Sequence, residues 1–159
     1  MPKPSLPTHR LSLQVLVLLI SAMGFYQTVN AQQRPTLTAE QQQRVQIHAV
    51  ANKENLYVIP GFDGGMSGGN VAVLVTEDGV LIVDNKFSYS YLEIMEMVRR
   101  VTPQPVRYVL NTHHHADHAG SNASFMPAAQ VVAHRNVRKN MLANDLSGLP
   151  EVLFEQSAT

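Results

Sequence analysis

The sequence predicts an α/β fold in which strands and helices form layers. Two β-branched, nearly all-apolar runs at 71–76 and 80–84 flank a turn that contains Asp78-Gly79, which is typical of a β-hairpin. An amphipathic segment at 89–101 follows, and further strand candidates then alternate with a helical one. Alternation of strand and helix along a chain is typical of layered α/β domains.

Residues 1–31 have the pattern of a secretory signal peptide. A short basic stretch precedes an apolar run at 11–20, and Val29 and Ala31 stand at the positions that a signal peptidase inspects. The apolar stretch of about 15 residues is shorter than the roughly 20 that a membrane-spanning helix needs. We therefore favour cleavage over an uncleaved anchor. The expected location is periplasmic or secreted, with no membrane attachment after cleavage.

The composition limits the classes of function. Subtracting residues 1–31 from the 159 of the chain leaves 128, which is enough for one domain. A hydrophobic content of 45% and a charged content of 15% exclude general disorder. Lys+Arg and Asp+Glu are equal at 12 each, so nothing indicates nucleic-acid binding. The absence of cysteine excludes disulfides, thiolate metal sites and cysteine nucleophiles.

The first elements after the signal are weakly patterned. Residues 32–44 are polar and rich in glutamine, and we expect a flexible leader with room for one helical turn after Thr38. The runs 45–50 and 55–59 are strand candidates. Five glycines fall within 61–70, which predicts a loop. A simple turn is favoured there over a mobile loop that covers a site.

The segments after the hairpin provide one more pair of strands and two helices. A stripe of apolar residues spaced by three predicts a helix over 89–101 that Thr102 and Pro103 end. The stripe consists of Leu92, Met95, Val98 and Val101. Strands are predicted at 106–110 and 129–133, and a short helix at 136–142. Since the hairpin strands are almost wholly apolar, both faces of the sheet are expected to be covered.

Four of the seven histidines lie within the six positions 113–118, directly after a predicted buried strand. Residues two apart on an extended chain point the same way, so His113 and His115 can converge on one ion while His114 points elsewhere. The adjacent Asp117 and His118 can supply an oxygen and a nitrogen to a second ion. The end of a strand is also where open α/β sheets usually place their sites.

Imidazole and carboxylate ligands suit Zn²⁺, with Fe or Mn as further possibilities. Two ions held close together would activate water and polarise a carbonyl or phosphoryl oxygen. The plain alternative is a polar loop with surface histidines. A pair of histidines would favour that alternative, whereas four histidines and an aspartate in this phase favour a metal site of one or two ions.

This segment resembles the metallo-β-lactamase superfamily through its His-x-His-x-Asp-His motif, which follows the similar stretch 108–112. The resemblance extends to the hairpin at 68–84 and to the strand and histidine at 131–134, and covers roughly 45–143. It implies a four-layer αββα sandwich, here a domain at 45–159. It also implies a hydrolase of esters, thioesters, lactams or phosphodiesters.

The resemblance also implies roles for individual residues. His113 and His115 would bind a first metal ion, and Asp117 and His118 a second. Asp117 would also be the catalytic residue that shuttles a proton. Asp84 would orient the ligand loop through hydrogen bonds.

The chain departs from the family pattern after the motif. The family has three more ligands there, but the one later histidine is His134, which by resemblance is not a ligand. The remaining carboxylates, Asp145, Glu151 and Glu155, lack a family context. Family domains also run to about 200 residues, so the chain resembles the N-terminal half of one and would leave an apolar face of its sheet exposed.

The sequence thus favours a metal-dependent hydrolase, represented by an N-terminal portion, that acts on a small-molecule substrate by attack of water. The alternative is a non-catalytic exported domain that binds metal or docks its exposed sheet on a partner. No choice among substrates follows from fold analogy.

Overall fold

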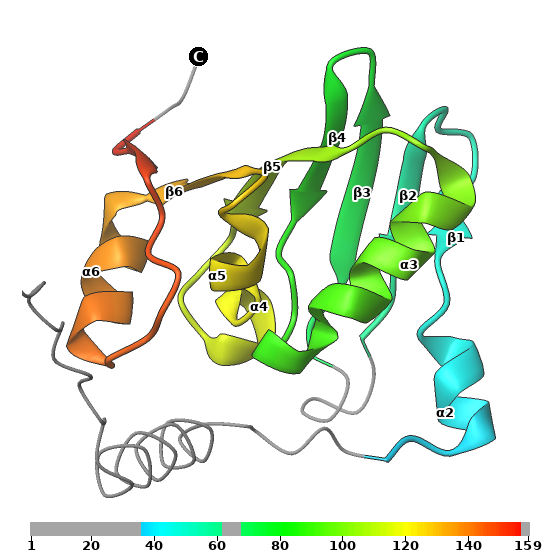
Figure 1. Cartoon of the computed structure of the whole chain (residues 1–159), viewed down its shortest axis with the longest axis horizontal. Coiled ribbons are helices and arrows are strands. Elements are labelled where there is room, and N and C mark those ends of the chain that lie inside the picture. The colour runs from blue at the N-terminus through cyan, green and yellow to red at the C-terminus, as the bar shows by residue number, and fades with distance from the viewer. Residues whose placement is uncertain (1–35, 62–67, 157–159) are drawn as a thin grey trace, which may run out of the picture. The chain divides into compact units, whose positions relative to one another are not determined.

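The structure is a computed structural model that describes residues 36–61 and 68–156 (Figure 1). The chain divides into two units, Met1–Gln32 and Gln33–Thr159, and all described residues lie in the second. The signal peptide predicted at 1–31 and the middle of the glycine-rich segment therefore lie outside the described residues.

A single seven-stranded sheet organises the described unit, with its strands in the order β1 to β7. The strands are β1 (His48–Ala49), β2 (Leu56–Ile59), β3 (Val71–Thr76), β4 (Gly79–Val83), β5 (Val106–Asn111), β6 (Gln130–His134) and β7 (Val152–Phe154). The helices are α2 (Ala39–Arg44), the 3-10 turn η1 (Ser88–Ser90), α3 (Tyr91–Val101), α4 (Ala116–Ala119), α5 (Asn122–Phe125) and α6 (Arg135–Ala143). The predicted α/β class is confirmed.

The sheet changes from antiparallel to parallel at β4. The pairs from β1 to β4 are antiparallel, and the predicted hairpin is present with Thr76 opposite Gly79. The pairs from β4 to β7 are parallel, with helices in the connections. Parallel strands need such crossovers, and they bring the carboxyl ends of β4, β5 and β6 to one edge, where the histidine segment begins.

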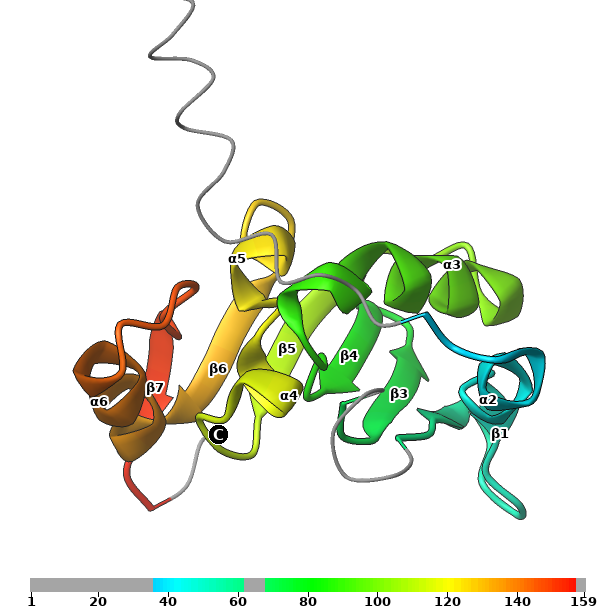
Figure 2. The ribbon, with the colours of Figure 1, turned by 90° about the horizontal axis from the view of Figure 1, so that it is seen from below.

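Helices cover one face of the sheet (Figure 2). The main core joins buried residues of α3 and α5, such as Ile94 and Phe125, to alternate residues of the strands, such as Val73, Ile82 and Val109. A second cluster packs α6 against Ala133 of β6. Burial of these side chains is the main source of stability, because each contributes about 1.5–3 kcal/mol when it leaves water.

The opposite face is apolar but partly open. Leu74, Leu81 and Tyr108 lie opposite one another on β3, β4 and β5. Leu74 is 37% exposed and Tyr108 is 42% exposed. The expectation that both faces are covered is therefore wrong for this face, whereas the exposed apolar face expected from the family resemblance is present.

Two predicted elements differ in detail from the observed ones. Leu92, placed in the apolar stripe of the 89–101 helix, is 75% exposed, because α3 instead faces the core with Tyr91, Ile94, Met95 and Val98. That set has the i, i+3, i+4, i+7 spacing of a helix face. Of the strand predicted at 45–50, only the two exposed residues of β1 are observed as a strand. Val45 is instead the C-cap residue of α2.

The segment 36–44 holds the helical turn for which the sequence left room. Thr38 accepts a hydrogen bond from the Gln41 amide, and the Gln41 side chain accepts one from the Thr38 amide. This reciprocal capping box explains why α2 begins at Ala39.

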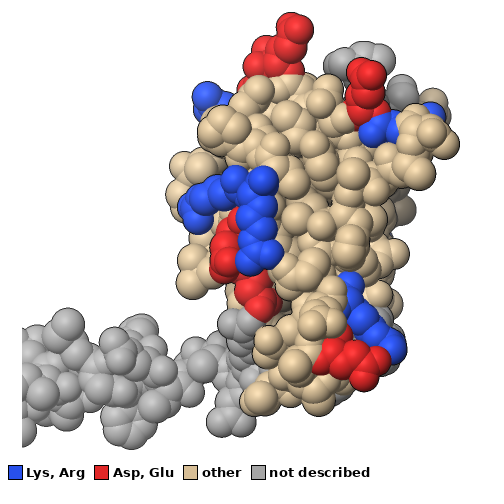
Figure 3. All heavy atoms as spheres, turned by 90° about the vertical axis from the view of Figure 1, so that its right-hand side faces the viewer, with Lys and Arg blue, Asp and Glu red and all other residues tan. Residues whose placement is uncertain are grey.

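Charged side chains of both signs lie beside one another on the face shown in Figure 3. The ion pairs of the described residues include those between Arg44 and Glu40 and between Arg100 and Glu96. Within residues 36–61 and 68–156, no helix has the length and apolarity needed to cross a membrane.

Candidate metal centre

Asp84 stands at the centre of the candidate site, one residue beyond β4. It is 4% exposed and has a φ of 61°, a left-handed conformation that is uncommon for residues other than glycine. Its Oδ1 accepts a hydrogen bond from the Thr112 amide at 2.8 Å, and its Oδ2 accepts one from the Thr112 hydroxyl at 2.7 Å. The Asp84 carboxylate therefore fixes the start of the segment that carries the histidines.

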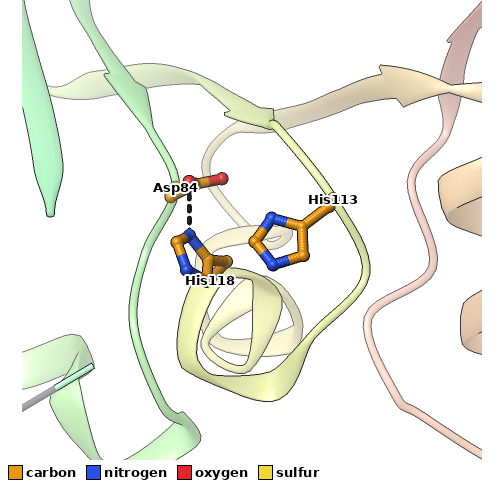
Figure 4. Close-up of side chains that lie close together, drawn as sticks. All are labelled: Asp84, His113 and His118. Carbon is orange, nitrogen blue, oxygen red and sulfur yellow. Dashed lines mark hydrogen bonds and ion pairs between the residues drawn. The ribbon is translucent and has the colours of Figure 1, made fainter. Parts of the chain in front are cut away.

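The same carboxylate orients His118. The Nδ1 atom of His118 lies 2.7 Å from Asp84 Oδ2, and Figure 4 shows the two side chains directed at each other with His113 beside them. Because a carboxylate only accepts hydrogen bonds, Nδ1 carries the proton, and Nε2 keeps its lone pair in the neutral ring. A carboxylate that holds a histidine in this tautomer is the usual support for a metal-binding imidazole.

His113 is held in the same tautomer by a relay through Thr112. The Thr112 hydroxyl donates to Asp84, so it accepts from Nδ1 of His113, which lies 3.0 Å away. Nε2 of His113 is then left to bind a metal ion. The rings of His113 and His118 lie with their centroids 4.0 Å apart.

His115 and Asp117 complete the cluster. His115 is the N-cap residue of α4, and its ring centroid lies 4.9 Å from that of His113. Asp117 lies in the first turn of α4, and its Oδ2 is 3.3 Å from Nε2 of His118. The structure thus brings together all four predicted ligands, His113, His115, Asp117 and His118.

Donor atoms of two sets each lie within 4.8 Å of one another. One set is His113, His115 and Asp117, and the other is Asp84, His113 and His118. Nitrogen and carboxylate donors at this separation fit a divalent ion such as Zn²⁺. In the second set the Asp84 carboxylate already accepts three hydrogen bonds, which suits an orienting role better than a ligand role.

His114 belongs to neither donor set, although its ring centroid lies 4.6 Å from that of His115. Extended alternation ends with β5 at Asn111, and the chain bends over 112–114. His134 is bonded elsewhere, with Nδ1 accepting from the Asn136 amide and Nε2 lying 2.8 Å from the Glu155 carbonyl oxygen.

The surroundings of His113 keep its imidazole in the form that binds metal. Burial, followed by the imidazoles of His118 and His115, lowers the pKa of His113 below its usual value, although the carboxylates of Asp84 and Asp117 act in the opposite direction. A lowered pKa keeps the imidazole neutral near pH 7, which is the form that binds metal.

Sequence reasoning missed the residues that hold α4 in place. The Asn85 amide donates to the His118 carbonyl at 2.7 Å, and the buried Asn85 side chain bonds the Asn122 amide group and the Ser121 amide. Lys86 and Gly69 also contact this region. Single polar residues next to a strand carry no periodic signal, so the sequence alone could not select them.

Comparisons with known proteins agree with this geometry. The sequence pattern of the metallo-beta-lactamase superfamily matches residues 64–157. No curated protein sequence matches the chain significantly.

Solved structures with a similar fold include three that are described as metallo-beta-lactamases. The enzyme from Hirschia baltica is 17% identical over 72% of this chain and 54% of its own, with a TM-score of 0.56. The Cronobacter sakazakii protein with a HARLDQ motif is 20% identical over 70% of this chain and 46% of its own, with a TM-score of 0.54. A B3 metallo-beta-lactamase with an active-site glutamic acid is 22% identical over 78% of this chain and 52% of its own, with a TM-score of 0.54. The chain spans about half the length of these structures, and the similarity shows the fold.

Proposed function

The chain belongs to the metallo-beta-lactamase superfamily, and on this basis we propose that it contributes the ligand segment of a metal-dependent hydrolase. One observation carries the proposal: His113, His115, Asp117 and His118 gather in the loop after β5 and in α4, where Asp84 orients His118. A structural polar loop would not need its imidazoles oriented in this way.

Zinc is the ion we propose, in one or two copies, with Fe or Mn as alternatives. When bound, such an ion lowers the pKa of water and polarises the bond under attack. The donor atoms we propose for His113 and His118 are their Nε2 atoms, because Nδ1 of each ring is engaged by Thr112 or Asp84. His115 and Asp117 would supply the donors that share a set with His113.

Asp117 is the residue we propose for proton transfer. Its side chain is 31% exposed, so it can reach both the cluster and solvent. A carboxylate in that position can take a proton from attacking water and release it to the leaving group. The substrate would be a small molecule with an ester, thioester, lactam or phosphodiester bond.

The hydrolase proposal predicts zinc-dependent turnover. Purified protein loaded with zinc should hydrolyse at least one of three probes: a chromogenic cephalosporin, a thioester or a phosphodiester. A chelator should abolish the activity and added zinc should restore it. Zinc binding without hydrolysis of any probe would favour the second candidate, a non-catalytic metal-binding or partner-docking domain, for which the partly exposed Leu74 and Tyr108 argue.

Export to the periplasm or the medium is also proposed, from the signal pattern at 1–31. Expression of the whole chain in a Gram-negative host should yield a mature form that begins at Gln32, as measured by intact mass and N-terminal sequencing of the periplasmic fraction. Replacing Ala31 by a bulky residue should block this cleavage. A cytoplasmic product that retains residue 1 would contradict the proposal.

A further inference from the structure

Lys86 is a buried cation close to the candidate site. It lies three residues beyond the end of β4, is 5% exposed and has a φ of 58°. Its ammonium donates to the carbonyl oxygens of Pro60 at 2.9 Å and Gly69 at 2.8 Å. Burial lowers the pKa of Lys86 to about 8. Burying a charge is costly, so we expect the hydrogen bonds of the Lys86 ammonium to have a specific role.

The Lys86 ammonium binds the carbonyl oxygen of Gly69, and other backbone atoms of Gly69 contact the proposed ligands. The Gly69 amide donates to the carbonyl oxygen of Asp117 at 2.9 Å. A Cβ atom added to Gly69 would lie 2.3 Å from Cε1 and 2.7 Å from Nε2 of His118. The Gly69 backbone is thus packed against the His118 ring, whose Nε2 we propose binds the ion. Asp84 holds Nδ1 of the same ring.

The backbone around Lys86 holds α4 as well. The Lys86 carbonyl accepts a hydrogen bond from the Gly120 amide at 2.9 Å, and the preceding Asn85 amide donates to the His118 carbonyl. The segment 84–86 therefore binds the ligand helix through its main chain. The Lys86 side chain adds the connection through Gly69.

We propose that Lys86 is a positioning residue of the metal centre, acting through Gly69 on His118 and Asp117. Its ammonium fixes the Gly69 carbonyl, and this places the Gly69 backbone against the His118 ring and the Asp117 carbonyl. Lys86 does not touch the ion. The inference rests on the proposed metal-binding function, because its consequence is the affinity of the site for metal.

The test compares Lys86→Met with Lys139→Met, which removes an exposed lysine of α6. Zinc affinity is measured by competition with a chromophoric chelator, and the state of the His118 ring by nitrogen NMR of the metal-free protein. Loss of an outer-shell partner typically weakens metal affinity about 10- to 100-fold. We expect a loss in that range and altered His118 ring signals for Lys86→Met, and neither change for Lys139→Met.

A purely structural role would lower the melting temperature of Lys86→Met but leave zinc affinity and the His118 signals unchanged, and that result would overturn the proposal. If Lys86→Met does not fold, Gly69→Ala provides the test instead. This variant keeps the lysine, and its added methyl group would clash directly with the His118 ring. Gly69→Ala should weaken zinc binding by a similar factor, and wild-type affinity in this variant would also refute the proposal. If the wild-type chain binds no zinc, the proposed function fails, whereas the NMR signals of His118 still test the positioning.

Discussion

Replacing His113 and His115 together by alanine is expected to abolish zinc binding. The two residues supply two of the three donors in one set and one of the three in the other. Catalytic zinc sites normally have three protein ligands, so neither set could hold an ion after the change. Metal content per chain, measured by elemental analysis after dialysis against trace zinc, should fall from one or two to the background level.

The control is His114→Ala, which removes an adjacent imidazole that belongs to neither donor set. If the affinity came from a general excess of histidine, His114→Ala would weaken zinc binding as much as either ligand substitution. Stability gives a second measure, since a ligand at 100 times its Kd stabilises the fold by about 2.7 kcal/mol. Zinc should raise the melting temperature of the wild type and of His114→Ala but not of the double variant. An unchanged metal content in the double variant would contradict the ligand assignment.

The parts of the site that the sequence predicts are those that lie close together along the chain. The His-x-His-x-Asp-His segment occupies six positions, and the hairpin is marked by the adjacent Asp78 and Gly79. Local spacing is sufficient in both cases, because a turn and a strand end bring neighbours together whatever the rest of the fold does. Asp84 was identified as an orienting residue through the family resemblance, and its bonds to Thr112 and His118 agree with that role.

The parts that the sequence could not predict depend on contacts between distant segments. Lys86 bonds Pro60, 26 positions away, and Asn85 bonds Asn122, 37 positions away. The phase of α3 is a second example, since an apolar row can begin at Tyr91 or at Leu92 and only packing on the sheet selects the row that includes Ile94. The short elements α5 and β7 also lack a periodic signal long enough to recognise.

Asp84→Asn is expected to weaken both the fold and the metal site. The change keeps the size of the side chain, and asparagine tolerates the positive φ at this position. The carboxylate accepts three hydrogen bonds, from the Thr112 amide, the Thr112 hydroxyl and Nδ1 of His118. Asparagine replaces one of the two carboxylate oxygens by an NH₂ group, which donates rather than accepts. At least one of the surrounding donors therefore loses its acceptor. Such a loss costs about 1–3 kcal/mol.

The effect on zinc follows from the tautomer of His118. If the asparagine NH₂ faces His118, the ring avoids two opposed donors by moving its proton from Nδ1 to Nε2, the atom that would bind the ion. Zinc affinity should then fall by about 10- to 100-fold. Denaturant unfolding of the metal-free protein and zinc titration measure the two effects separately. Asp145→Asn is the matched control, because Asp145 also has a positive φ of 52° but is exposed. Equal stability and equal zinc affinity in Asp84→Asn and Asp145→Asn would show that the Asp84 carboxylate does not orient the site.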